Sequence, residues 1–154
     1  MTDTPSADAA DYFAAGAPIA EVLTEGTWID SNTDVTPIEL VPGLVFRPII
    51  GDRLAASVVH FEPNVVAPVH AHVEEQISLV LEGELEFEVN GERRLLRPGM
   101  AVVIPPNTPH GARTHDSPCV EIDLFHPPRQ GLLDAMRKQQ ERAGRAVRRG
   151  EGAD

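Results

Sequence analysis

The chain lacks the features that mark several large classes of protein. It has a single cysteine, Cys119, which excludes an intrachain disulfide and agrees with a reducing compartment. No apolar run approaches the ~18 residues that a membrane helix needs. Residues 1–18 contain neither Lys nor Arg, so the basic segment that opens a signal peptide is missing. We therefore expect a cytoplasmic protein with no membrane partner.

Positive charge is also scarce. The 154 residues carry a formal net charge of −11, and no Lys or Arg precedes Arg47. Binding nucleic acid needs clustered basic side chains, so we expect no nucleic-acid partner. The one basic cluster lies in residues 137–149, which hold six basic residues against Glu141 alone. That segment could touch RNA or anionic lipid, but a solvated helix end is the simpler interpretation.

The pattern predicts one domain with three regions. Residues 1–35 form an N-terminal arm, residues 36–130 a β-barrel, and residues 131–154 a C-terminal helix and tail. The arm contains a stretch at 8–15 that could make one or two helical turns and an apolar patch at 18–23. It could lie across the barrel or across a partner subunit.

The barrel is predicted from many short segments bounded by Pro, Gly and Asn, a texture typical of all-β sandwiches and barrels. The clearest strand covers residues 84–89, where Leu85, Phe87 and Val89 alternate with three glutamates. Asn90-Gly91 then supplies a two-residue turn. The expected strands are 38–40, 44–49, 54–61, 76–81, 84–89, 94–96, 101–104 and 120–125, and a helical pattern follows at 132–149.

Chemistry is concentrated in two segments. In the first, Pro68-Val-His-Ala-His-Val-Glu-Glu-Gln76, the residues His70, His72 and Gln76 share one parity. In an extended chain they would point to one face, if the intervening turn preserves register. Two imidazoles and an amide oxygen suit a borderline divalent cation. Alone, such a pair of histidines is usually a surface feature.

The second segment raises the odds of a metal site. Pro105-Pro106-Asn107-Thr108-Pro109 leads into His110. Three prolines stiffen the approach to a single histidine, which suggests that its position matters. Together, His70, His72, Gln76 and His110 form the predicted ligand set for one divalent ion. The donor set accepts Ni²⁺, Zn²⁺, Fe²⁺ or Mn²⁺.

These two segments resemble the two motifs of the cupin family. The spacing His70-x-His72-x3-Gln76-x6-Gly83 is similar to the first motif, and Gly99-x5-Pro105-x4-His110 is similar to the second. The chain departs from the family pattern at Asn64 in place of the leading glycine, at Gln76 in place of the usual Glu, and at Thr114 in place of Asn. The resemblance implies a single cupin barrel, a jelly roll. The neutral amide favours Lewis-acid chemistry over stabilising high-valent iron.

A narrower resemblance points to the uronate-linearising cupins of pectin and alginate breakdown. It rests on His-x-His-x3-Gln, on Leu-Glu-Gly-Glu-Leu, and on the segment from Glu121 to Arg129. The resemblance implies that Asp123, Phe125 and Arg129 line a pocket beside the metal. It also implies roles: Asp123 would shuttle a proton, Phe125 would form a wall, and Arg129 would hold a substrate carboxylate.

The function that we expect is a metal-dependent isomerase that opens and tautomerises an unsaturated uronate or a similar cyclic enol. Two alternatives stay open: a non-haem metal dioxygenase or polyketide cyclase of specialised metabolism, and a non-catalytic binding module. The remaining histidines, His60, His115 and His126, are expected to be structural or exposed. Glu75 is a fallback ligand. The expected partners are a small, anionic substrate and a second copy of the chain in a homodimer.

Overall fold

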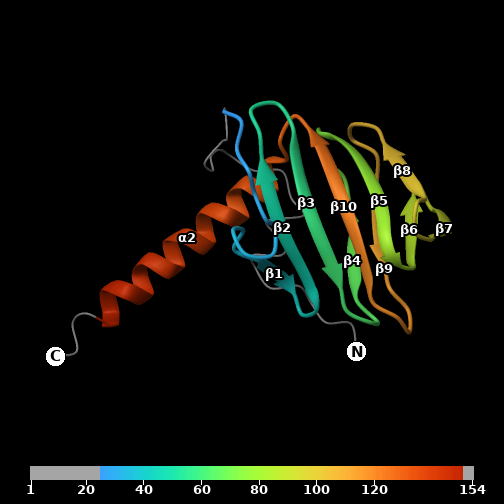
Figure 1. Cartoon of the computed structure of the whole chain (residues 1–154). Helices are drawn as coiled ribbons and strands as arrows, with labels where there is room; N and C mark the ends of the chain where they lie inside the picture. The colour runs from blue at the N-terminus through green and yellow to red at the C-terminus, as the bar shows by residue number, and fades with distance from the viewer. Residues whose placement is uncertain (1–24, 151–154) are drawn as a thin grey trace.

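The structure is a computed structural model that describes residues 25–150 (Figure 1). The predicted helical turns at 8–15 and the apolar patch at 18–23 lie outside the described residues. Two antiparallel sheets face each other, followed by one helix, which confirms the predicted all-β barrel with a C-terminal helix. Among the described residues, no helix has both the length and the apolar character needed to cross a membrane.

The larger sheet has six strands in the order β1-β2-β3-β10-β5-β8, and the smaller has four in the order β4-β9-β6-β7. The six are β1 (Ile38–Val41), β2 (Leu44–Ile50), β3 (Ala55–Phe61), β10 (Cys119–His126), β5 (Glu75–Gly83) and β8 (Ala101–Ile104). The four are β4 (Val66–His70), β9 (His110–Arg113), β6 (Leu85–Val89) and β7 (Glu92–Leu96). Crossovers between the sheets make this a jelly roll.

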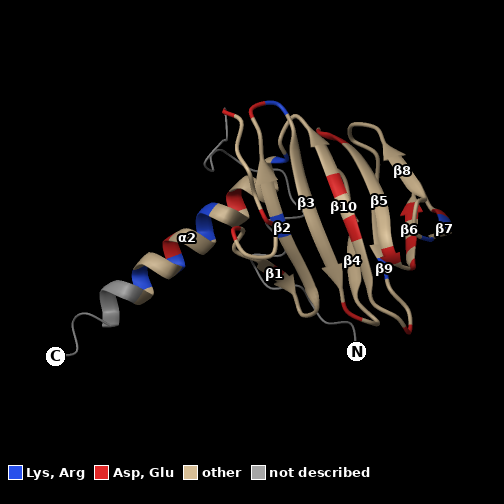
Figure 2. Cartoon of the chain, viewed as in Figure 1, with Lys and Arg blue, Asp and Glu red and all other residues tan. Residues whose placement is uncertain are grey.

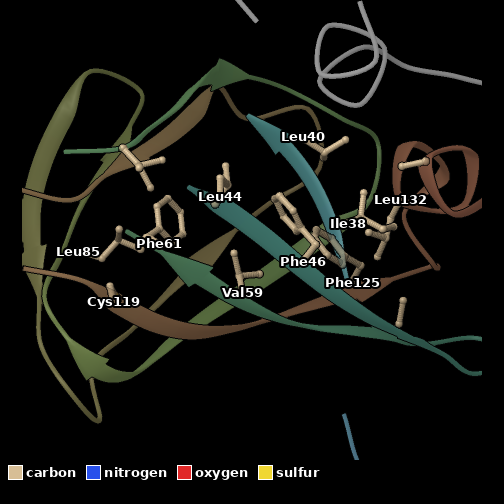
Figure 3. Close-up of a cluster of buried hydrophobic side chains, with 14 of the residues drawn as sticks. Ile38, Leu40, Leu44, Phe46, Val59, Phe61, Leu85, Cys119, Phe125 and Leu132 are labelled. Carbon is tan, nitrogen blue, oxygen red and sulfur yellow. The ribbon is translucent and has the colours of Figure 1, made fainter. Parts of the chain in front are cut away.

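Alternation along the strands builds the core between the sheets. In β2 and β3, every second residue is buried, and in β10 the odd-numbered residues face inward. Figure 3 shows Phe46, Val59, Phe61 and Phe125 within this core. Three polar side chains, Glu121, Asp123 and Ser57, share the same buried face. The interior is therefore apolar with a few polar groups held inside it.

Two strands, β4 and β9, were not predicted from the sequence, and they carry His70 and His110. β4 ends at His70 and pairs with β9, which begins at His110. β4 contains Pro68 and two exposed valines, and β9 reads His-Gly-Ala-Arg, so neither shows apolar alternation. Their pairing depends on contacts distant in sequence, which a local pattern does not reveal.

The helix α2 (Gln130–Gly150) packs on the barrel through its first turns only. Leu132, Leu133 and Ala135 are buried, whereas residues 141–143 are exposed. Figure 1 shows the rest of the helix extending away from the sheets, and Figure 2 marks the Lys and Arg positions along it in blue. The helix thus serves as a cap at one end of the barrel and as a projecting arm beyond it.

Candidate metal centre and cavity

Three histidines from three separate pieces of chain meet between the sheets. His70 ends β4, His110 begins β9, and His72 lies in the connection from β4 to β5. One ring nitrogen from each lies within 4.8 Å of the others, so the cluster could hold a metal ion. His72 and His110 are buried, and His70 is partly buried. These are the three histidines that the sequence predicts as ligands.

Backbone carbonyls fix the tautomer of all three rings. The Nδ1 atoms of His70, His72 and His110 lie 2.8, 3.0 and 2.7 Å from the carbonyl oxygens of Pro68, Glu74 and Thr108. Because a carbonyl only accepts, each Nδ1 must donate, and each Nε2 is left without a proton. Metal-ligating histidines are oriented in this way.

Gln76 completes the cluster with its amide oxygen. Its Nε2 donates to Ser78 Oγ at 2.9 Å and to Asp123 Oδ1 at 3.1 Å, which turns Oε1 toward the histidines. Oε1 lies 3.1 Å from His72 Nε2 and 3.2 Å from His110 Nε2. All three atoms are acceptors, so their approach is favourable only around a cation. Ligands about 2.1 Å from a metal and at right angles to each other would lie about 3.0 Å apart, so the residues present fit a divalent ion.

Burial keeps the imidazoles of His70 and His110 neutral. Desolvation and, next, the nearby His110 lower the pKa of His70 to about 3. Desolvation likewise lowers the pKa of His110 to about 4, with a smaller contribution from His72. A neutral imidazole is the form that coordinates metals. The cluster is thus ready for a cation at neutral pH.

Glu74 ties the cluster to the helix, a role that the sequence did not predict. Its Oε2 lies 3.3 Å from His72 Nδ1, and its Oε1 accepts a hydrogen bond of 2.8 Å from the backbone N–H of Gln130 at the start of α2. Burial raises the pKa of Glu74, but the hydrogen bonds from His72 and Gln130 outweigh it and bring the pKa to about 2. Glu75, the fallback ligand, is exposed.

A cavity that is partly open to solvent adjoins the cluster. Asp123, Phe125 and Arg129 line it, as predicted by resemblance, together with His70, Gln76 and His110. Arg129 is only 2% exposed, and its positive charge lowers the pKa of both Asp123 and Glu74. The rings of Phe125 and His72 meet edge-on with centroids 5.8 Å apart.

Asp123 is the buried acid beside Gln76. Its Oδ1 accepts from Ser78 Oγ at 2.5 Å as well as from Gln76. Burial raises the pKa of Asp123 to about 6, opposed by these hydrogen bonds and by Arg129. Asp123 therefore both orients Gln76 and presents a carboxyl group to the cavity.

The cluster does not form in the way that the parity argument supposed. His70 belongs to the four-stranded sheet and Gln76 to the six-stranded sheet, so no single extended face carries both. The connection at 71–74 crosses from one sheet to the other and brings them together. The other histidines lie elsewhere: His60 is on the outer side of β3, and His115 and His126 are exposed.

Two further buried polar residues were missed, although a signal for each was present. Ser78 follows Gln76 by two residues and shares its face of β5. Glu121 precedes Asp123 by two residues and shares its face of β10. The parity that grouped Asp123 with Phe125 extends to Glu121 without further assumption.

Fold and cluster together define a small jelly-roll barrel with a candidate metal site at an internal cavity. A family model for the cupin domain matches residues 57–125. The pectin degradation protein KdgF of Dickeya dadantii is 34% identical over 103 residues, which span 65% of this chain and 94% of that protein. The chain belongs to the cupin family, and its predicted resemblance to the uronate-linearising cupins is confirmed.

Two other similarities frame this assignment. The solved structure of KdgF from Halomonas sp. is 34% identical, with a TM-score of 0.64, covering 71% of this chain and all of that one. Dimethylsulfoniopropionate lyase DddQ of Ruegeria pomeroyi is 39% identical over 79 residues, 51% of this chain but only 39% of the lyase. The chain thus spans well under half of that relative. These similarities support an enzyme of the cupin type.

Proposed function

We propose that this cupin is a metal-dependent isomerase that converts a ring-form 4,5-unsaturated uronate into its open-chain 4-deoxy-5-keto form. One observation carries the proposal: the buried pair Asp123 and Arg129 lines the same cavity as His70, Gln76 and His110. An acid, a cation and a ligand cluster around one small cavity suit an anionic substrate that must be held and moved through proton transfer. The similarity to KdgF along nearly its whole length supports the same substrate class.

The proposed ligands are the three histidines with Gln76 as the fourth. When bound, a divalent ion supplies Lewis-acid stabilisation of negative charge on a substrate oxygen. Because Gln76 brings no charge to the site, the ion would keep its full positive charge. The chemistry is redox-neutral, so neither an oxidant nor a reductant is required.

The chain's own side chains account for the remaining steps. Arg129 pairs with the substrate carboxylate, a role that suits a planar guanidinium. Asp123 takes the proton from the anomeric hydroxyl as the C1–O5 bond breaks and the aldehyde forms. It then delivers a proton to C4 as the enol becomes the C5 ketone, so that atoms balance. Phe125 packs as an apolar wall beside His72.

The test is turnover of unsaturated galacturonate, followed by loss of the ultraviolet absorbance of the C4=C5 bond conjugated with the carboxylate. The metal-loaded protein should exceed the spontaneous rate, and Asp123→Asn should abolish the excess while retaining metal. The asparagine oxygen can still accept from Gln76, so this variant separates proton transfer from ligand positioning. Asp116→Asn, an exposed acid, is the matched control and should be unaffected.

Three outcomes would overturn the proposal. Full activity in Asp123→Asn would remove the proton shuttle. If the protein did not convert the unsaturated uronate but consumed oxygen with an enolic aromatic compound, the dioxygenase alternative would be favoured. Tight ligand binding by metal-free protein without turnover would favour the binding module.

A further inference from the structure

A second buried carboxyl group lies at the cavity, and the proposed mechanism does not use it. Glu121 is 2% exposed and lines the cavity. Its Oε2 makes no hydrogen bond with any residue that the structure describes. Leaving a buried polar atom without a partner costs about 1–3 kcal/mol. Such an atom at a cavity wall is therefore available to hydrogen-bond a ligand.

Glu121 lies farther along β10 from the level of Gln76 than Asp123 does. Along β10, Phe125 pairs with Gln76, Asp123 with Ser78, and Glu121 with Val80. With a rise of about 3.3 Å per residue, Glu121 lies about 7 Å beyond Asp123, on the side away from Phe125. The cavity therefore extends from the metal ligands to an end around Glu121, which we call its floor.

The floor is otherwise apolar. Glu121 faces Val59 across β3 and Val80 across β5. Besides Glu121, the lining residues outside the metal cluster and the Asp123–Arg129 region are Phe46, Val59, Phe61, Ala67, Phe87, Gly111 and Ala112. Figure 3 shows Phe46, Val59 and Phe61 among the core side chains. A single polar group in an apolar wall discriminates strongly between ligands that can pair with it and ligands that cannot.

The residues around Glu121 indicate which kind of ligand group it would bind. Burial, and next the nearby Asp123, raise the pKa of Glu121 well above its usual value, which favours the neutral acid, a group that both donates and accepts. Arg129 acts on Asp123 but is not among the groups that act on Glu121. The floor therefore suits a neutral hydroxyl group, and the substrate carboxylate belongs at the Arg129 end.

We propose that Glu121 is a specificity-determining residue that hydrogen-bonds a substrate hydroxyl at the cavity floor, remote from the carboxylate held by Arg129. This inference rests on the proposed function, because the substrate that it selects is a hydroxylated unsaturated uronate. Glu121 selects among substrates, whereas Asp123 carries the proton transfer.

The experiment compares kcat/KM for the unsaturated uronate with kcat/KM for its 2-deoxy and 3-deoxy analogues. The wild-type protein should disfavour one of the two analogues by at least about tenfold. In Glu121→Leu, that ratio should fall to within about twofold, because the floor no longer distinguishes a hydroxyl from hydrogen. Glu121→Gln should retain the ratio, since an amide also donates and accepts. Glu121→Val is a second apolar variant in case leucine fails to pack.

Ser57→Ala is the matched control. Ser57 Oγ is also buried without a hydrogen-bond partner among the described residues, but Ser57 does not line the cavity. This variant should retain the wild-type ratio, and all variants should keep the metal content of the wild type. A general loss of packing would lower kcat/KM for all three substrates alike and leave the ratio unchanged.

The outcomes separate this inference from the proposed function. Turnover of the parent uronate with an unchanged ratio in both apolar variants overturns the role of Glu121 and leaves the proposed function standing. A wild-type protein that accepts both analogues as well as the parent overturns it too. A wild-type protein that converts none of the three overturns the proposed function, and the inference falls with it.

Discussion

Among single residues, Gln76 matters most to the proposed metal site, because hydrogen bonds hold its amide in one orientation. Asp123 and Ser78 both accept hydrogen bonds from its NH₂ group. Its oxygen is thereby directed at the imidazoles of His72 and His110. Reversing the amide would place its oxygen against the carboxylate of Asp123 and would turn its N–H groups, which cannot bind a metal, toward the imidazoles. The proposed metal site thus depends on Asp123, a residue that would not itself bind the metal.

This dependence predicts that Asp123→Ala weakens metal binding, whereas Asp123→Asn does not. Loss of the acceptor frees the amide to rotate, and the loss of such an outer partner typically costs 10–100-fold, or about 1.4–2.7 kcal/mol, in affinity. Titration of Zn²⁺ against a competing chelator measures the difference. Equal affinities in wild type and Asp123→Ala would show that Asp123 does not position Gln76.

Glu121 predicts a pH dependence of stability. Its pKa in the folded protein is raised, by burial and then by Asp123, and Glu121 in turn contributes to the raised pKa of the buried Cys119. A raised folded pKa gives stability that is fully present below the unfolded pKa and is lost as pH rises toward the folded pKa. Glu121→Gln removes this loss, since glutamine does not ionise.

Urea unfolding of metal-free wild type and Glu121→Gln across a pH series is the measurement. The free energy of unfolding of the wild type should fall relative to the variant as pH rises above about 4.5, the ordinary range of a glutamate. Parallel curves for the two proteins would mean that burial of Glu121 does not affect its ionisation.

Among the elements, β5 carries both Gln76 and the glycine that ends the first motif. Gly83 has φ +75°, and a Cβ atom there would lie 2.0 Å from the carbonyl oxygen of Pro118. Gly91 has φ +81° in the turn between β6 and β7, and beyond its two chain neighbours no atom of the described residues lies within 4 Å of its Cβ position. The two glycines therefore share a backbone demand but differ in the space around them.

We expect Gly91→Ala to lose about 1–2 kcal/mol, the cost of the left-handed conformation alone. Gly83→Ala should lose more than about 3 kcal/mol or fail to fold, because β5 must also move away from Pro118. Urea unfolding compares the pair. Equal losses would show that the close approach of the Pro118 segment to β5 does not constrain the protein.

Element prediction succeeded where side chains alternate and failed where they do not. The strands at 84–89 and 120–125 were predicted because apolar residues recur at every second position. β4 and β9 lack that signal, since Pro68 and Gly111 interrupt them and the two valines of β4 are exposed. The site was still predictable because the spacing of its residues matched the family motifs. Glu74 was not, because its role depends on a helix that begins 56 residues later.

For the whole molecule, the homodimer stays a prediction, and the structure indicates a surface for it. Outward side chains on the six-stranded sheet are apolar where polar residues would be expected on a solvated face. Ile77 and Val103 are paired across β5 and β8 and are 36% and 59% exposed, and Leu81 is 41% exposed. Homodimer interfaces are richer in apolar area than other surfaces, which favours a second copy as the occupant.

Sedimentation velocity tests this surface. We expect a dimer in wild type and a monomer in Val103→Lys, because a buried unpaired ammonium is costly. Val66→Lys changes a valine of similar exposure, 57%, on the other sheet and should leave the dimer intact. A monomeric wild type, or a dimer that survives Val103→Lys, would contradict the assignment.

Our proposal for the whole molecule is that His70, His72, Gln76 and His110 hold one divalent ion per chain. It is tested by the metal content, measured by inductively coupled plasma mass spectrometry, of protein loaded with Zn²⁺ and then desalted. Wild type and His115→Ala, which removes an exposed histidine away from the cluster, should retain one ion per chain. His110→Ala should retain almost none while remaining folded by circular dichroism. A full equivalent of zinc in His110→Ala would contradict the account.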